Sequence, residues 1–145
     1  IILLMGKKIT IYTDGACSGN PGKGGWAAVI IEDKNEKTIS GSEPLTTNNR
    51  MELSAVINAL KEVGSAELDI YTDSKYVKNG IESWIKNWKI NGWMTAAKQP
   101  VKNKDLWLEL DTLVSEKAIG WKWVKGHSND HYNTIVDEAA RKAIR

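Results

Sequence analysis

The 145-residue sequence has a single cysteine, no phenylalanine and no long hydrophobic run. One cysteine, Cys17, excludes an internal disulfide and is compatible with a reducing, cytoplasmic location. The apolar opening Ile1–Met5 is too short to span a membrane or to act as a signal peptide. We therefore expect residues 1–5 to be an N-terminal extension without a function, with Met5 as a candidate start. Residues 6–145 are expected to form one domain, a monomer without membrane contact or an obligate protein partner.

Acidic residues are absent from the stretch Trp84–Lys104. This stretch carries five lysines: Lys86, Lys89, Lys98, Lys102 and Lys104. Its charge of +5, within a chain of net charge +2, leaves −3 for the remainder. Basic charge concentrated in one segment indicates a surface for nucleic acid.

Motifs for common cofactors are also missing. No Gly-x-x-x-x-Gly-Lys-Ser/Thr loop is present, and Gly22-x-Gly24-x-x-Ala27 precedes a predicted strand where a dinucleotide motif must open a helix. These glycines are instead expected to shape a hairpin that nucleic acid can approach closely. His127 and His131 form a His-x-x-x-His pair without the helix and glutamate of a zinc protease, which argues against zinc.

The hydrophobic pattern predicts strands first and helices afterwards. Alternation indicates strands at residues 8–13, 26–32 and 37–43, with turn-rich sequence over 15–25, and this spacing suggests an antiparallel meander. Apolar residues at helical spacing follow from Leu53 to Leu60, and Asn48 or Asn49 can cap that helix. Two further strands are expected, at residues 68–72 and 119–125. Helical segments are expected after the first of these strands up to residue 79, around Trp84 and Trp88, over 106–113 and over 135–143. This order predicts an α/β fold with helices packed on a mixed sheet.

Two acidic residues occupy matching places, because Asp14 and Asp73 each follow a short strand that ends in Tyr-Thr. If the two strands are neighbours, the carboxylates face one another and repel unless a cation lies between them. Oxygen ligands suit Mg²⁺ or Mn²⁺. Alternatively, each aspartate only caps the next segment. Taken alone, Glu52 is explained by the helix dipole in a first turn, and Asp137 by a solvated helix face.

Four longer stretches carry distinctive motifs: Tyr-Thr-Asp-Gly-Ala-Cys-Ser-Gly-Asn-Pro-Gly (12–22), Thr-Thr-Asn-Asn-Arg-Met-Glu-Leu (46–53), Tyr-Thr-Asp-Ser-Lys-Tyr-Val (71–77) and Trp-Val-Lys-Gly-His (123–127). Together these stretches resemble type 1 ribonuclease H. The likeness is collinear from about residue 8 onward. It implies a ribonuclease H-like five-stranded mixed sheet, an antiparallel meander plus parallel strands, flanked by helices. It also implies endonucleolytic, sequence-independent cleavage of the RNA strand of RNA·DNA hybrids.

On this resemblance the metal-binding acids are Asp14, Glu52, Asp73 and Asp137. Four carboxylates suit two Mg²⁺ ions, with Mn²⁺ as an alternative, that hold the attacking water and the departing 3′ oxygen when substrate is bound. The expected products carry a 5′ phosphate and a 3′ hydroxyl. His127 matches the family's mobile histidine, which assists proton transfer or product release.

The resemblance also implies contacts with the hybrid. Asn20, Asn48 and Asn49 are expected at its backbone and minor groove, and Thr47 and Asn103 in a pocket for a DNA phosphate. The lysine-rich segment is similar to the family's basic protrusion, in which Trp84, Trp88, Lys86 and Lys89 would contact the DNA strand. Packing between helices is an equal alternative for Trp84, whereas Trp107, Trp121 and Trp123 are expected in the core.

Several positions depart from the family pattern. Ile90, Met94, Ala97 and Gln99 stand where basic residues are common, and Leu45 where some relatives place an arginine. Weaker hybrid binding with a shallower salt dependence is therefore expected. Residues 133–136 before Asp137 are also unusual, although the spacing from His127 is kept.

Three other functions are compatible with parts of the sequence. A hybrid-binding module without activity would have no need for four acids. A DNA-cutting nuclease of the same fold family would lack the asparagine-rich and tryptophan/lysine features. An α/β enzyme acting on other substrates would be expected to carry a cofactor motif. An assay on RNA·DNA hybrid, RNA duplex and DNA duplex, with Mg²⁺ and with chelator, distinguishes all of these.

Overall fold

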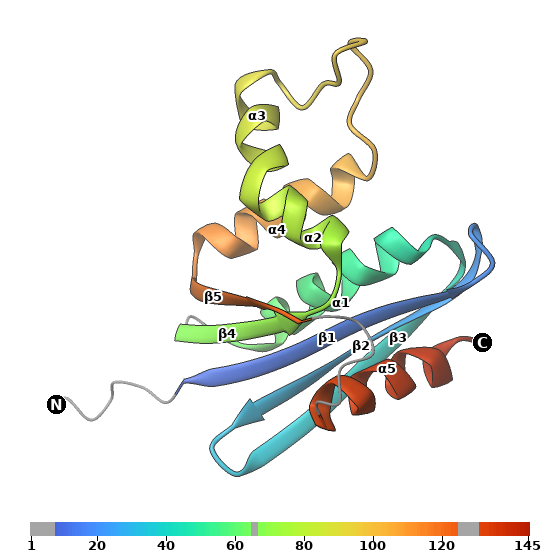
Figure 1. The fold of residues 1–145 in the computed structure, drawn as a ribbon, viewed down its shortest axis with the longest axis vertical. Helices are drawn as coiled ribbons and strands as arrows, with labels where there is room; N and C mark the ends of the chain where they lie inside the picture. Colours follow the sequence, from blue (N-terminus) through green and yellow to red (C-terminus); the bar gives the residue numbers. More distant parts are fainter. Residues whose placement is uncertain (1–7, 65–66, 125–130) are drawn as a thin grey trace, which may run out of the picture.

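The computed structural model describes residues 8–64, 67–124 and 131–145. Within them, five strands form one sheet in the order β3-β2-β1-β4-β5 (Figure 1). β1 (Ile9–Ser18), β2 (Gly22–Glu32) and β3 (Asn35–Thr46) pair antiparallel, whereas β4 (Glu67–Thr72) and β5 (Ala118–Trp123) run parallel to β1. The predicted α/β fold with a mixed five-stranded sheet is confirmed.

Helices cover both faces of this sheet (Figure 1). α1 (Asn48–Glu62) and α4 (Lys104–Ser115) lie on one face, and α5 (His131–Ala143) packs on β1 and β2 from the other. α2 (Lys75–Asn79), a π-helical turn (Gly80–Trp84) and α3 (Ile85–Ile90) follow β4. α3 and the loop after it project away from the sheet at the top of Figure 1, so the lysine-rich segment forms a protrusion.

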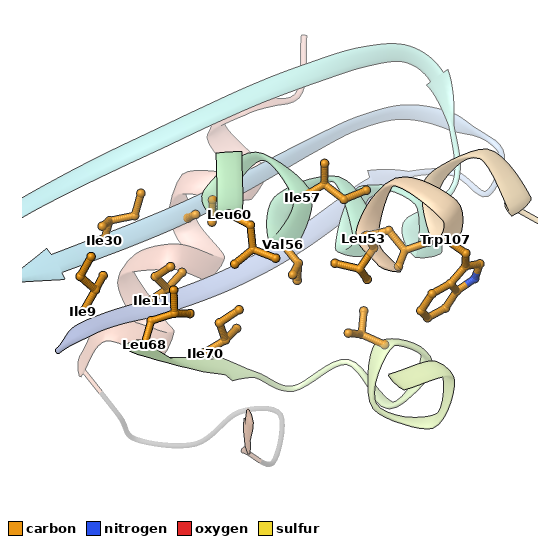
Figure 2. Packing of buried hydrophobic residues seen from close by; sticks show 14 of the residues in the cluster. Ile9, Ile11, Ile30, Leu53, Val56, Ile57, Leu60, Leu68, Ile70 and Trp107 are labelled. Atoms are coloured by element: carbon orange, nitrogen blue, oxygen red, sulfur yellow. The ribbon is translucent and has the colours of Figure 1, made fainter. Parts of the chain in front are cut away.

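The main core lies between α1 and the sheet (Figure 2). Strand alternation directs Ile9 and Ile11 of β1 toward α1, while Tyr12 joins a second cluster beneath α5. The α1 side chains that fill the main core are those predicted from helical spacing: Leu53, Val56, Ile57 and Leu60. Because α1 is anchored on β1 by this burial, any side chain near its start is held against the middle of β1.

The end of β1 differs from the prediction. Asp14 does not follow the strand but lies within it, opposite Ala27 of β2, because pairing with β2 continues to Ser18. The turn predicted over residues 15–25 is correspondingly reduced to residues 19–21. Gly25 belongs to β2, and a Cβ there would lie 2.3 Å from the Ala140 carbonyl oxygen, so glycine at this position lets α5 approach the sheet.

The start of α1 also differs from the prediction. The N-cap is Thr47, whose Oγ1 accepts from the Arg50 N–H at 3.2 Å, rather than Asn48 or Asn49. The backbone N–H of Asn48 donates instead to Oδ1 of the Asn20 side chain, at 3.1 Å. With the helix beginning at Asn48, Glu52 lies beyond the first turn, so the helix dipole does not account for it.

Smaller differences concern α5 and the tryptophans. α5 includes His131 and does not begin only at residue 135, and Tyr132 in its first turn packs on Tyr12 at 5.3 Å between ring centres. Trp107 is fully buried as expected. Trp121 and Trp123 are only half-buried, stacked on each other at 5.5 Å against the main core. Among the described helices, none is long and apolar enough to cross a membrane.

Candidate active site

Three acidic side chains from distant parts of the sequence meet beside the central strand of the sheet, β1. Asp14 comes from β1, Glu52 from α1 and Asp73 from the turn after β4, and each offers a carboxylate oxygen within 4.8 Å of the others. Asp14 and Glu52 are buried, and Asp73 is half-buried. This group can hold a metal ion.

The parallel pairing of β1 with β4 brings the two aspartates together. Tyr12 lies opposite Tyr71 at the last paired position, so Asp14 and Asp73 both stand two residues beyond it. The turn that carries Asp73 is held on both sides, because the Ser74 N–H donates to Thr72 Oγ1 at 3.1 Å and Ser74 Oγ caps α2. The recurring Tyr-Thr-Asp is therefore a consequence of equivalent places on neighbouring strands.

Glu52 reaches the two aspartates because α1 passes directly over Gly15. A Cβ on Gly15 would lie 2.5 Å from the Glu52 backbone nitrogen and 2.6 Å from the Met51 carbonyl carbon. Neither backbone atom can move without shifting the helix. The glycine beside Asp14 thus sets the separation between Asp14 and Glu52, and its N–H donates to Asp14 Oδ1 at 3.0 Å.

Burial and the like charge of neighbouring carboxylates raise the pKa of Asp14 and Glu52. Loss of solvation raises the pKa of Asp14 from 3.8 to about 8, with the charge of Asp73 as the next cause. Burial likewise raises the pKa of Glu52 well above 4.5, and the charges of Asp14 and Asp73 add to the shift. A divalent cation reverses this penalty, because it attracts the ionised form of each carboxylate.

One carboxylate oxygen of Glu52, Oε1, is buried without a hydrogen-bond donor among the described residues. A buried carboxylate oxygen without a donor is costly unless a cation satisfies it. An all-oxygen donor set of carboxylates matches the preference of Mg²⁺ or Mn²⁺. The residues present therefore fit a hard divalent metal.

Asp137 adjoins this group without belonging to it. Asp137 lies on α5, half-buried and ion-paired with Arg141 at 2.9 Å, and it is not one of the three clustered acids. Its carboxyl nevertheless contributes to the raised pKa of Asp14, so it adjoins the cluster from the α5 side. His127 lies outside the described residues.

The asparagines expected at the hybrid gather around the start of α1. Asn20, in the turn between β1 and β2, holds the Asn48 N–H, and both side chains are exposed, as is that of Asn49. These three residues therefore form an exposed polar surface beside the helix start.

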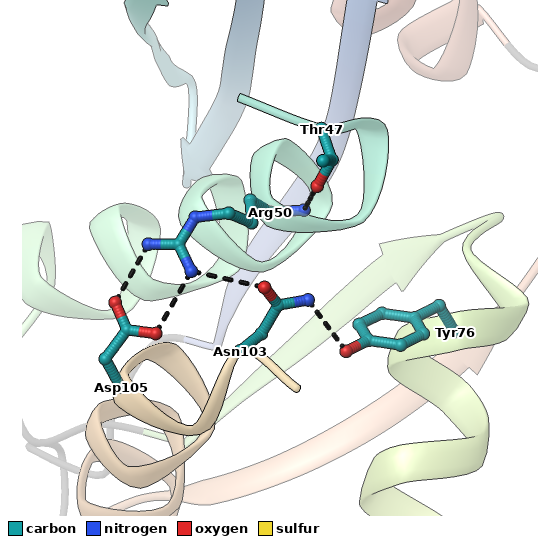
Figure 3. A network of polar contacts seen from close by, with 5 residues as sticks. All are labelled: Thr47, Arg50, Tyr76, Asn103 and Asp105. Carbon is teal, nitrogen blue, oxygen red and sulfur yellow. Dashed lines mark hydrogen bonds and ion pairs between the residues drawn. The ribbon is translucent and has the colours of Figure 1, made fainter. Parts of the chain in front are cut away.

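Thr47 and Asn103 are joined by a residue that the sequence did not single out, Arg50 (Figure 3). Its backbone N–H is capped by Thr47, and its guanidinium donates to Asn103 Oδ1 at 3.2 Å and to both oxygens of Asp105. Asn103 in turn donates to the Tyr76 hydroxyl at 3.0 Å. Apart from the Thr47 cap, these partners are separated by 27 to 55 positions along the chain, so no local pattern indicates their contacts.

The protrusion residues have two kinds of contact. Trp84 and Trp88 pack against the main core, and Trp84 meets Tyr76 edge-on at 5.5 Å, which supports helix packing for Trp84. Both tryptophans also line an apolar groove with Tyr76. Lys86 is exposed, whereas Lys89 is ion-paired with Asp111 at 3.1 Å.

Comparison with known proteins identifies the family of this chain. The family model for RNase H matches residues 6–145. A ribonuclease H from Ehrlichia canis is 61% identical over 138 residues, which cover 94% of each chain. One from a Wolbachia strain of Drosophila simulans is 58% identical over 95% of this chain and 96% of its own. The chain belongs to the ribonuclease H family, and it is an endoribonuclease, a hydrolase.

Solved structures share the fold. LC9-RNase H1, a type 1 RNase H with the type 2 active-site motif, superposes with a TM-score of 0.85 at 29% identity, covering 95% of this chain and 72% of that one. LC11-RNase H1, solved in complex with an RNA/DNA hybrid, has a TM-score of 0.69 at 24% identity over 94% and 96% of the two chains. The resemblance seen in the sequence is confirmed.

Proposed function

We propose that this chain hydrolyses the RNA strand of RNA·DNA hybrids internally and without reading base sequence. The products would carry a 5′ phosphate and a 3′ hydroxyl. The observation that carries the proposal is the cluster of Asp14, Glu52 and Asp73 in a member of the ribonuclease H family. A protein of the same fold that was solved with an RNA/DNA hybrid supports the substrate class.

The acids would bind Mg²⁺, or Mn²⁺ as an alternative, with Asp137 as a fourth ligand and two ions present when substrate is bound. Bound metal would supply stabilisation for the charge on the attacking and departing oxygens of the phosphodiester. Water adds to phosphorus as the P–O3′ bond breaks, and O3′ leaves as a hydroxyl once it is protonated. We propose that His127 transfers that proton, and this role rests on the sequence pattern alone.

The protein's own contribution is rigidity and burial. Asp14 is held inside a strand that is paired on both sides up to Tyr12, and Glu52 is held by the packing of α1 over Gly15. Ligands fixed in this way need little reorganisation when charge develops in the reaction. The half-buried Asp73 leaves one side of the cluster open to substrate.

Substrate binding is proposed to use both strands of the hybrid. Asn20, Asn48 and Asn49 would contact its backbone and minor groove, where 2′ hydroxyls identify the RNA strand. Thr47 and Asn103 would bind a DNA phosphate. Along the protrusion, the contacts would come from Trp84, Trp88, Lys86 and Lys89. We further propose that residues 6–145 act as one domain, as a monomer in the cytoplasm, with residues 1–5 not required.

The test is cleavage of labelled RNA·DNA hybrid, RNA duplex and DNA duplex, each with Mg²⁺ and with chelator. We expect loss of the RNA strand of the hybrid alone, only when Mg²⁺ is present. Absence of cleavage on all three substrates would instead favour a module that binds hybrids, and cleavage of the DNA duplex would favour a DNA nuclease.

Matched variants on β4 and its following turn test the site itself. Asp73→Asn is expected to abolish cleavage with an unchanged circular dichroism spectrum, because it removes an ionised ligand and keeps the side-chain shape. Asp69→Asn is the control, since Asp69 lies on the same strand and pairs with Lys8 at 3.3 Å. Full activity in Asp73→Asn, or equal loss in both variants, would refute the assignment.

A further inference from the structure

Asn103 stands at the start of α4 in an unusual conformation. Its backbone is left-handed, with φ 61° and ψ 28°, and its side chain does not cap the helix that it precedes. Asparagine tolerates this conformation better than most residues. Its amide is therefore available for contacts elsewhere, and it makes two of them, with Arg50 and Tyr76 (Figure 3).

These two contacts determine which way round the amide lies. Arg50 has only donors, so the atom that faces its Nη1 at 3.2 Å must be the carbonyl oxygen of Asn103. The amide nitrogen then faces the Tyr76 hydroxyl at 3.0 Å, which also accepts from Trp107 Nε1 at 3.0 Å. The nitrogen carries a second hydrogen that these contacts do not use. A phosphate requires a donor, and this orientation provides one.

Arg50 is itself held in place by Asp105. Its Nη1 and Nη2 donate to the two carboxylate oxygens at 3.0 and 2.8 Å, which is a bidentate pair. The backbone N–H of Arg50 also donates to Thr47 Oγ1, which caps α1. Arg50 thus connects two proposed phosphate ligands, one at the start of α1 and one at the start of α4.

We propose that Arg50 is a positioning residue, which holds the amide of Asn103 with its N–H toward a DNA phosphate of the hybrid. This inference rests on the proposed function and assigns a role within the same binding surface. Without the guanidinium, the amide can turn over and present its oxygen to the phosphate, which repels it. Because Asp105 neutralises the charge of Arg50, the effect acts through Asn103 and not through direct attraction.

A structural role alone predicts a different outcome. The Arg50 and Asp105 side chains are 34% and 65% exposed, and an ion pair at such a surface contributes little to folding stability. Lys61 and Glu109 form a second ion pair between the same two helices, without contact to Asn103. Lys61→Ala is therefore the matched control for the loss of a link between α1 and α4.

The experiment measures KM and kcat for hybrid cleavage in Arg50→Ala, Asn103→Ala, the double variant and Lys61→Ala. We expect Arg50→Ala and Asn103→Ala each to raise KM about ten-fold with little change in kcat, because one hydrogen bond to a charged phosphate is lost. In the double variant KM should also rise about ten-fold, and not by the product of the two single effects. Lys61→Ala should leave both constants unchanged, and Arg50→Lys should restore part of the loss.

Salt titration separates the two ways in which Arg50 could act. If it acts through the neutral amide, Arg50→Ala leaves the slope of log KM against log salt concentration unchanged. An unchanged KM in Arg50→Ala, a multiplicative double variant, or a slope lowered by about one would overturn the proposal. Failure of the wild-type chain to cleave hybrid would refute the proposed function instead, so the two failures are distinguishable.

Discussion

Replacing Asp14 by asparagine should make the metal-free protein less sensitive to pH. Asp14 is 8% exposed, and its pKa is about 8 in the folded chain against 3.8 in the unfolded one. Between these two pH values the folded protein keeps a proton that the unfolded chain has released. The free energy of unfolding of the wild type therefore falls as pH rises through this window, by up to about 5 kcal/mol.

An asparagine side chain has nearly the same shape as that of aspartate, but it does not titrate in this pH range. The difference in unfolding free energy between Asp14→Asn and the wild type should consequently grow in favour of the variant from pH 4 to pH 8. Glu52 adds a dependence of the same sign, since its pKa is also raised, and this part is reduced in the variant because Asp14 is one of its causes. The variant should still be inactive toward hybrid.

The assay is urea unfolding, followed by tryptophan fluorescence at several pH values with chelator and again with Mg²⁺. Mg²⁺ should stabilise the wild type increasingly toward pH 8, where the carboxylates ionise most readily, and should stabilise Asp14→Asn less. Glu138→Gln, an exposed residue of α5, serves as the control and should follow the wild type. A constant difference between Asp14→Asn and the wild type across this pH range would refute the reasoning.

Three further outcomes are expected. Gly15→Ala should lower the unfolding free energy by about 1–3 kcal/mol and strongly reduce the initial rate of cleavage, because its Cβ collides with the backbone at Glu52; a wild-type rate would contradict the role of this close approach. Lys86→Ala should lower the log–log salt slope of hybrid binding by about one, and Lys89→Ala by less, since Lys89 is paired with Asp111. The wild-type slope should be shallower than that of a relative with basic residues at positions 90, 94, 97 and 99, and an equal slope would contradict this.

The sequence alone was sufficient for much of the fold, and it pointed to three acids that the fold brings together. Alternation and helical spacing identified all five strands and the core face of α1, because these periodicities follow directly from backbone geometry. The repeated Tyr-Thr-Asp indicated Asp14 and Asp73, and the surrounding motif indicated Glu52. The strand end at Asp14 was predicted wrongly, since it depends on a partner that is not adjacent in sequence, because β2 pairs beyond Asp14. The cap of α1 was also predicted wrongly, because Thr47 and not an asparagine accepts from the Arg50 N–H.

The tertiary structure decided how those residues act together. Only the parallel register of β1 and β4 places Asp14 level with Asp73, and only the packing of α1 over Gly15 brings Glu52 to them. Burial, which raises the pKa of Asp14, is a property of the assembled layers and not of any local segment. The contact of Arg50 with Asn103 joins residues 53 positions apart. Residue types and periodicity are properties of short segments, whereas distances between side chains of different elements exist only once the sheet and helices have packed.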